Sequence, residues 1–259
     1  MRSYDTIPMR ILLLASTSDT AGMMIHDEVR AILPEDALHH IALMAIEGSL
    51  LECDPPAGYD LIVFLSKHRA QSGVNALCVH AIGNFGEARF GGRDGMLVPT
   101  HPGMLTALYR SLKAQDPITD LGAYTVSLEA VHHGPYTTTP SIFYELGSSQ
   151  VQWLDRDAAR IMARVLVETL SRPIAERSSF FGFGSNHYCA GFDELTDRYD
   201  FAGSCARYAL SSVTEDHVAW IERRADIIVL DERSMGPEKR RIRALLEAVG
   251  AGYEKRKDL

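Results

Sequence analysis

Short apolar runs alternate with longer amphipathic stretches along the whole chain. Compact apolar runs predict buried strands, and apolar residues that recur every three or four positions predict helices. We expect strands over residues 10–15, 41–46, 61–65, 76–81, 123–130, 142–146, 180–184 and 227–230. We expect helices over residues 19–33, 102–113, 153–170, 214–224 and 237–249. Strands that alternate with helices predict an α/β fold with a mixed, largely parallel central sheet flanked by helices.

Two segments lack a clear period. Residues 82–100 are rich in glycine, which predicts a long loop that is either functional or mobile. Residues 189–213 predict an excursion over the site. The sequence contains neither an internal repeat nor a low-complexity linker, so residues 1–259 are expected to form a single hydrolase-type domain.

The composition is that of a globular protein, with 46% apolar and 23% charged residues. No apolar run approaches the roughly 20 residues that span a bilayer, and residues 1–9 lack the features of a signal peptide. We therefore expect a cytoplasmic location and no membrane partner. The four cysteines are far apart and are expected to be reduced thiols.

A net charge of -8 argues against binding nucleic acid through the whole surface. One basic stripe is nevertheless predicted, because Arg156, Arg160 and Arg164 are four residues apart on the polar side of a helix. The stripe could contact phosphates. The sequence favours the alternative, a solvated face paired with Asp157 and Glu168.

Polar clusters follow five of the predicted strands. They occupy residues 66–69, 80–85, 129–135, 145–149 and 184–188. Ligands of open α/β sheets bind in the crevice outside the carboxyl ends of the strands. We therefore expect the five clusters to share one composite pocket, which is the candidate active site.

The side chains in these clusters suit a metal-assisted hydrolase. A hydrolytic zinc site needs about three protein ligands, drawn from imidazoles and carboxylates, and one open position. Enough candidates are present, namely His80, His132, His133, His187, Glu129 and Glu145. No HExxH spacing occurs, so the ligands would come from separate strands, and the spacing leaves open which histidines bind. A metal-free site, with a histidine as base or oxyanion donor, also stays open.

Other reactive side chains are expected to be structural. His26, His39 and His40 lie on or next to predicted helix and strand bodies, and His101 lies near the start of a predicted helix. Cys189 is expected to be a packed small residue rather than a nucleophile.

The motifs together resemble one enzyme family, the archaeal and plant type of D-aminoacyl-tRNA deacylase. They lie at residues 15–22, 64–68, 79–86, 128–135, 143–148 with Trp153, and 182–188. The resemblance implies a zinc-associated hydrolase that cleaves the ester between a D-amino acid and the 3′ end of tRNA. It also implies an α/β fold akin to phosphorylases and zinc peptidases.

By matching position, the site would consist of His80, Glu129, His132, His133, Glu145 and His187, and the resemblance leaves open which of them hold metal. We assign catalysis to Glu129, His132, His133 and Glu145. We assign zinc binding to His80, His132, His133 and His187. We assign substrate binding to Lys67, His68, Asn84, Phe85, Gly184, Ser185, Asn186 and Tyr188. In this interpretation Glu129 or Glu145 moves a proton, and backbone N–H groups of residues 184–186 stabilise the oxyanion.

The chain departs from the family pattern at several positions. Lys67 replaces an arginine, and Ser204 and Arg207 stand where the family tends to have histidine and lysine. Two other functions therefore remain as alternatives. One is a metallo-hydrolase of a small ester or amide, such as an N-acyl or peptidyl amino acid. The other is a non-catalytic RNA-binding descendant of the enzyme.

Overall fold

A computed structural model describes residues 9–71, 73–175 and 177–259. Residues 1–8, which belong to the segment considered above for a signal peptide, lie outside the described residues. The strands of the main sheet are β1 (Ile11–Ser16), β2 (Ile41–Ile46), β3 (Leu61–Lys67), β4 (Ala76–Ile82), β7 (Thr125–His132) and β8 (Ser141–Gly147). A second sheet contains β9 (Ser179–Phe183), β10 (Asp200–Cys205), β11 (Ile227–Leu230) and β12 (Glu254–Lys255). A small hairpin consists of β5 (Ile118–Thr119) and β6 (Gly122–Ala123).

Most of the predicted helices are confirmed by the structure. They are α1 (Thr20–Ile32), α2 (Pro102–Lys113), α3 (Gln150–Trp153), α4 (Arg156–Leu170), α5 (Glu215–Glu222) and α6 (Glu238–Val249). Short 3-10 helices are η1 (Glu35–His39), η2 (Asp193–Asp197), η3 (Leu210–Ser212) and η4 (Arg256–Asp258). Among the described residues, no helix combines the length and the apolar content that crossing a bilayer requires.

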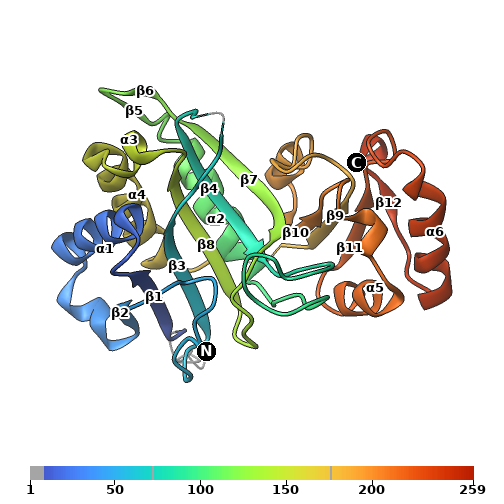
Figure 1. Ribbon diagram of the computed structural model, residues 1–259, viewed down its shortest axis with the longest axis horizontal. Coiled ribbons are helices and arrows are strands. Elements are labelled where there is room, and N and C mark those ends of the chain that lie inside the picture. Colours follow the sequence, from blue (N-terminus) through green and yellow to red (C-terminus); the bar gives the residue numbers. More distant parts are fainter. Residues whose placement is uncertain (1–8, 72, 176) are drawn as a thin grey trace, which may run out of the picture.

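The main sheet has the strand order β2-β1-β3-β8-β4-β7 (Figure 1). Strands β2, β1, β3 and β8 run parallel to one another. Strand β4 pairs with β8 in the antiparallel sense and with β7 in the parallel sense. The expected mixed, largely parallel sheet is therefore confirmed. The second sheet, β10-β9-β11-β12, is all parallel and lies on the β7 side of the first.

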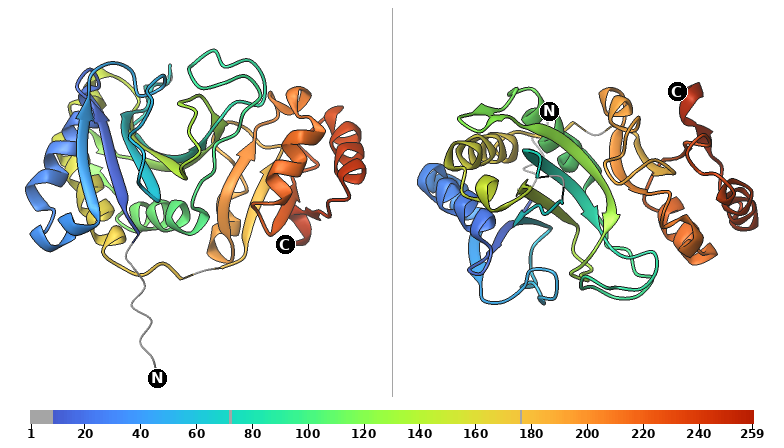
Figure 2. Two further views of the ribbon diagram at one scale, coloured as in Figure 1. Left: turned by 90° about the horizontal axis from the view of Figure 1, so that it is seen from below. Right: turned by 45° about the horizontal axis from the view of Figure 1, so that its top comes forward.

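Helices α1, α2 and α4 pack together on one face of the main sheet (Figure 2). Alternating apolar residues in β1 divide the core between the two faces. Ile11 and Leu13 belong to the large cluster under these helices, which continues into the second sheet. Leu12 and Leu14 belong to a smaller cluster with Phe64 on the opposite face. That opposite face, which these helices do not cover, carries the site.

The turn after β1 shows why the first helix begins where it does. Asp19 is the N-cap of α1, and its carboxylate accepts a hydrogen bond from the Gly22 N–H at 2.9 Å. A Cβ at Gly22 would lie 2.3 Å from the Leu65 carbonyl oxygen. Glycine therefore lets the helix pack directly against strand β3.

Three segments differ from their predicted form. The helix predicted over 153–170 is interrupted after Trp153, because Asp155 accepts hydrogen bonds from the N–H groups of Asp157 and Ala158 and starts α4. Residues 189–213, expected as an excursion over the site, contain strand β10, which pairs with β9. The end of the chain from Glu254, where no strand was predicted, contributes β12 to the second sheet.

Candidate functional site

Three adjacent strands bring the central side chains of the site together. In the sheet register, His80 of β4 lies opposite Glu129 of β7, and Cys78 of β4 lies opposite Glu145 of β8. Side chains two residues apart on a strand share a face, so all four side chains lie on the same face. Because β4 runs antiparallel to β8, the carboxyl ends of these two strands lie at opposite edges of the sheet. The placement of all the polar clusters at one edge is therefore wrong, and the side chains meet within the sheet. The expected shared pocket is supported, because residues from four of the five clusters line one cavity.

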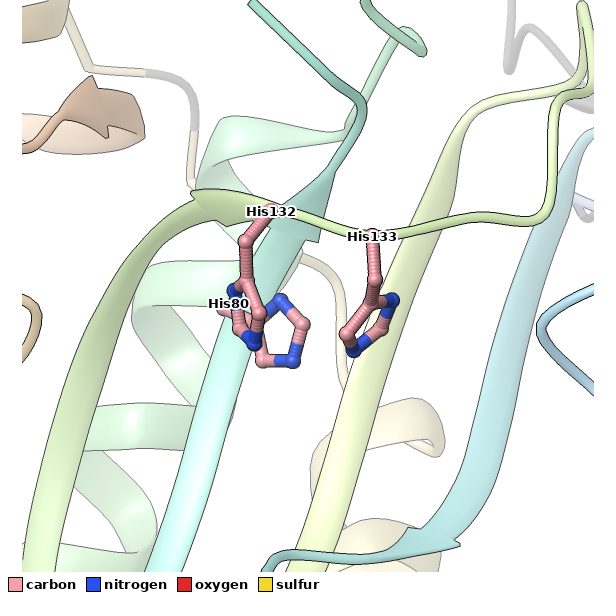
Figure 3. A group of neighbouring side chains, drawn as sticks. All are labelled: His80, His132 and His133. Carbon is pink, nitrogen blue, oxygen red and sulfur yellow. The ribbon is translucent and has the colours of Figure 1, made fainter. Parts of the chain in front are cut away.

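A bulge in β7 turns His132 toward this group. His80 is aligned with Glu129, but Ile82 is aligned with His132, so β7 carries one extra residue. Without that residue, His132 and Glu129 would point to opposite faces. Figure 3 shows the rings of His80, His132 and His133 gathered together where β7 ends. The ring centroids of His80 and His132 are 4.4 Å apart, and those of His132 and His133 are 4.3 Å apart.

Backbone carbonyl groups fix the orientation of these three imidazoles. His80 Nδ1 lies 3.0 Å from the Ala81 oxygen, His132 Nδ1 lies 2.8 Å from the Ala130 oxygen, and His133 Nδ1 lies 2.7 Å from its neighbour's carbonyl oxygen. A carbonyl only accepts, so each Nδ1 donates its hydrogen. In the neutral ring, Nε2 then keeps a lone pair, as in metal-binding histidines.

The fourth histidine of the predicted site comes from the second sheet. His187 follows strand β9, and its carbonyl oxygen accepts a hydrogen bond of 2.8 Å from the Ala130 N–H of β7. His187 Nδ1 lies 3.0 Å from the Tyr208 hydroxyl. The His187 ring packs against that of His132, with centroids 4.6 Å apart. The site is therefore shared between the two sheets.

Glu129 lies at the centre of the histidines and is fully buried. Its carboxylate oxygens are 3.2 Å from His68 Nδ1, 3.5 Å from His187 Nε2, and 3.8 Å from both His80 Nε2 and His132 Nε2. Within the described part of the chain, neither oxygen has a hydrogen-bond partner, and His80 Nε2 has none either. Buried charged atoms without hydrogen bonds are costly, and an uncompensated group of them fits a cation-binding site.

Several sets of these ligand atoms are close enough together to hold one metal ion. Within each set, the ligand atoms lie within 4.8 Å of one another. The sets are His80, His132 and His133; Glu129, His132 and His187; His80, Glu129 and Glu145; and His68, Cys78 and Glu129. His68, predicted to bind substrate, thus lies among the possible ligands.

The surroundings favour charged carboxylates and two neutral imidazoles. Burial raises the pKa of Glu129, but the nearby His187, His80 and His68 outweigh burial and lower it. Burial together with the charges of His133 and His80 keeps the pKa of His132 well below its usual range. Burial and the charge of His80 lower the pKa of His133 to about 4. Anionic carboxylates and neutral imidazoles are the forms that bind metal ions.

In the rest of the cluster, His68 and His80 hold their protons more tightly, whereas Glu145 holds its proton less tightly. Burial raises the pKa of Glu145, but contacts with His68 and His80 outweigh burial and lower it. Burial lowers the pKa of His68 and His80, but the two carboxylates outweigh burial and raise both values. A bound cation would compete with these two protons for the carboxylates.

The cluster opens into a cavity of about 1040 Å³. Glu145 and four of the histidines line the cavity, whereas Glu129 does not. The other lining residues include Lys67, Arg69, Phe90 and Trp153. The cavity is large enough for a small organic group, and charged and aromatic side chains surround it.

Some residues predicted to bind substrate have structural contacts instead. The Asn84 side-chain amide donates to the Gly91 oxygen at 3.0 Å and so holds the glycine-rich loop. Phe85 is buried and packs against Phe181 and His217. Neither Asn84 nor Phe85 lines the cavity.

The segment after β9 is also held internally. The Gly184 N–H donates to the Cys205 oxygen, and the Ser185 N–H donates to the Ser234 hydroxyl. Both N–H groups already have acceptors within the protein, which does not favour these two as oxyanion donors. The side-chain oxygen of Asn186 accepts a hydrogen bond from the Ala190 N–H.

Two of the residues predicted to bind substrate, Lys67 and Tyr188, are better placed to contact a bound molecule. Lys67 lines the cavity, with its ammonium 3.9 Å from Asp19. The Tyr188 ring lies edge-on to His68, with centroids 6.1 Å apart, and its hydroxyl is 3.5 Å from His68 Nε2. Tyr188 is partly exposed and therefore accessible beside the cluster.

The predicted site omitted several cavity residues at the end of β1 and in the turn after it. Ser16, Ser18 and Asp19 line the cavity. The Asp19 carboxylate accepts hydrogen bonds from the Lys67 N–H and the Ser66 hydroxyl, so it joins the ends of β1 and β3. The rule that polar residues follow the strand ends would have found these residues if it had been applied to the first strand.

Two of the structural expectations are confirmed. His101 is the N-cap of α2, and its Nδ1 accepts a hydrogen bond from the Met104 N–H. Cys189 is buried, with its sulfur 3.0 Å from the Ser204 hydroxyl, and burial raises the pKa of its thiol. A thiol held protonated in this way is a poor nucleophile.

The arginines of the predicted basic stripe are engaged by neighbouring side chains. Arg156 and Arg160 both contact the Glu28 carboxylate, and Arg160 also pairs with Asp157 at 2.9 Å. Arg164 donates a hydrogen bond to the side chain of Gln115. These contacts favour the interpretation of the stripe as a solvated, paired surface over one that is free to contact phosphates.

A family model described as D-aminoacyl-tRNA deacylase matches residues 56–253. The D-aminoacyl-tRNA deacylase of Methanospirillum hungatei is 38% identical over 191 residues, which cover 71% of this chain and 42% of that protein. The D-aminoacyl-tRNA deacylase of Cenarchaeum symbiosum is 32% identical over 256 residues, which cover 94% of this chain and 98% of that protein. The chain thus spans less than half of the first relative and almost all of the second.

A solved structure has the same fold. The crystal structure of a conserved protein of unknown function, AF0625, superimposes with a TM-score of 0.85 and 24% sequence identity. The superposition covers 96% of each chain, so both sheets and their mutual arrangement are shared. The match of the family model to most of the sequence shows that this chain belongs to the D-aminoacyl-tRNA deacylase family.

Proposed function

We propose that this protein hydrolyses the ester bond between a D-amino acid and the 3′ end of tRNA. Family membership supports the substrate class, since the relatives that cover most of the chain are named D-aminoacyl-tRNA deacylases. The observation that carries the proposal is the buried cluster of carboxylates and histidines open to a cavity of about 1040 Å³. Such a cluster can activate water beside a bound ester. A cytoplasmic location is consistent with an enzyme that acts on tRNA.

We propose zinc as the cofactor, held by His80, His132 and His133. The unpartnered His80 Nε2 and the carbonyl groups that anchor each Nδ1 support this set. His187 belongs to a second set, with Glu129 and His132, and would complete the four histidines assigned from the sequence. When bound, the ion would supply Lewis-acid polarisation of the ester carbonyl.

The two glutamates have different roles in this proposal. Glu145 lines the cavity and its pKa is lowered, so its carboxylate is ionised at neutral pH and can accept a proton from the attacking water. Glu129 does not line the cavity and contacts His68, His80 and His132. We infer that Glu129 positions these imidazoles.

Binding geometry would supply much of the rate. An aminoacyl ester is already activated, so holding its carbonyl beside Glu145 accounts for a large share of the acceleration. Lys67, which lines the cavity, is suited to a phosphate or carbonyl oxygen of the substrate. Discrimination between D and L would depend on which side chain fits the cavity.

The test is hydrolysis of D-tyrosyl-tRNA and L-tyrosyl-tRNA by the purified protein. We expect cleavage of the D ester alone, loss of cleavage after treatment with a chelator, and recovery with zinc. A Glu28→Gln variant is a suitable control, because Glu28 is a buried carboxylate that pairs with arginines outside the cavity. Equal cleavage of both esters, or of neither, contradicts the proposal, and hydrolysis that a chelator leaves unchanged contradicts the zinc assignment.

A further inference from the structure

One aromatic side chain of the cavity is unusually exposed. Phe90 lines the cavity, yet 69% of its surface remains accessible. A single exposed apolar residue needs no explanation by itself. Phe90 differs because its main chain is fixed next to the histidine cluster.

Several contacts hold the loop around Phe90. The Phe90 carbonyl oxygen accepts a hydrogen bond of 3.1 Å from the Gly134 N–H, one residue after His133. The next carbonyl, that of Gly91, accepts the side-chain amide of Asn84. A Cβ at Gly91 would lie 1.9 Å from the Leu51 oxygen, so glycine is needed where the loop crosses that residue. The Phe90 ring is therefore presented from a fixed point beside the cluster, which lowers the entropy cost of binding to it.

An unpaired cation lines the same cavity. Arg69 is exposed, and no ion pair or hydrogen bond joins its guanidinium to the described part of the chain. Lys67, by contrast, lies near Asp19 and above the Trp153 ring. An accessible aromatic face and a free guanidinium are the two groups that bind a nucleotide, the first by stacking on the base and the second by pairing with the phosphate.

We propose that the mouth of the cavity is a subsite for the terminal nucleotide of the tRNA, in which Phe90 stacks on the adenine and Arg69 pairs with the phosphate on its 5′ side. The inference rests on the proposed function and extends it to the part of the substrate beyond the ester. The scissile ester is attached to the ribose of that same nucleotide. A base platform tethered next to His133 is therefore placed to hold the ester at the histidine cluster.

The first experiment measures binding directly. Fluorescence anisotropy with a 5′-labelled CCA trinucleotide is recorded for the wild type, Phe90→Ala, Phe90→Trp and Arg69→Gln. Loss of base stacking predicts that Phe90→Ala weakens binding by about fivefold or more, whereas Phe90→Trp retains it. Arg69→Gln should weaken binding and make it less sensitive to salt. Leu38→Ala and Arg240→Gln are matched controls, because both residues are exposed and lie outside the cavity lining.

The second experiment measures cleavage of D-tyrosyl-tRNA and D-alanyl-tRNA. Phe90→Ala should raise KM by the same factor for both esters, because adenine is common to them. Wild-type trinucleotide binding by Phe90→Ala overturns the inference. A larger loss with D-tyrosyl-tRNA than with D-alanyl-tRNA also overturns it, since Phe90 would then contact the amino-acid side chain. Binding that depends on Phe90 in a protein that cleaves neither ester would refute the proposed function and leave the subsite intact.

Discussion

Replacement of Glu145 by glutamine separates the roles of the two buried carboxylates. The change keeps the shape of the side chain and removes its charge. Glu145 is 4% exposed and lies 3.5 Å from His68, 3.7 Å from His80 and 3.9 Å from His133. An amide there cannot accept the proton of the attacking water, and it leaves His68 and His80 with Glu129 as their main anionic neighbour.

The expected loss of activity follows from the role of Glu145 as a general base. Such a base contributes about 10²- to 10⁴-fold, which corresponds to about 3 to 5 kcal/mol in activation free energy. We expect kcat for D-aminoacyl-tRNA to fall by that factor, with a small change in KM. Because the pKa of Glu145 is lowered, its carboxylate stays ionised even at a pH somewhat below the ordinary glutamate pKa of 4.5. Its protonation therefore limits the wild-type rate only in acid solution.

The assay is single-turnover hydrolysis of D-tyrosyl-tRNA from pH 5 to pH 8 for the wild type, Glu145→Gln and Glu129→Gln. Glu28→Gln serves as the matched control, and thermal unfolding of each variant establishes that it is folded. Loss of activity in Glu145→Gln together with near wild-type stability supports the assignment. A Glu145→Gln variant within about threefold of the wild type, combined with an inactive Glu129→Gln variant, refutes it, because the base would then be Glu129.

Three further predictions concern metal affinity, packing and protonation. His80→Ala should weaken zinc binding by at least about tenfold in competition with a chromophoric chelator, and an unchanged affinity excludes His80 as a ligand. Gly22→Ala should lower the free energy of unfolding in urea by about 1 to 3 kcal/mol, because its Cβ would meet the Leu65 oxygen at 2.3 Å, whereas Gly252→Ala, with open space around it, should not. His133 should titrate near pH 4 in NMR spectra of the zinc-free protein, since burial lowers its pKa, and stability should fall as the pH decreases from about 6.5 toward 4 because the unfolded chain then binds more protons. Titration of His133 near pH 6.5 would contradict the last prediction.

The order of strands and helices was readable from the sequence wherever the apolar pattern is strong. Residues 41–46 and 227–230 form strands with the predicted bounds, and Pro102 and Lys113 bound α2 as expected. Strand β10 was missed because its sequence, DFAGSC, contains glycine and serine and has an irregular register at Gly203. Its place in the sheet depends on pairing with β9, which is tertiary information.

Prediction of the site succeeded for residue types and failed for geometry. The five residues at the centre of the predicted site do lie together, namely His80, Glu129, His132, His133 and Glu145. They are brought together by the antiparallel pairing of β4 with β8 and by the bulge in β7, and not by a shared edge of the sheet. Neither strand direction nor a bulge is encoded in a local apolar pattern.

Phe90 gave no sequence signal beyond the glycines next to it. Its significance depends on hydrogen bonds to residues far along the chain, including Gly134. Contacts of this kind can be inferred only after the fold is known.

The contribution of His187 from the second sheet has a consequence for folding studies. A molecule in which both sheets had formed but had not docked would keep most of its circular dichroism and yet lack one imidazole beside Glu129. Hydrolysis would then recover later than secondary structure during refolding. The enzymatic rate would serve as a sensor of the final docking step, which spectroscopic measures of helix and strand content do not detect.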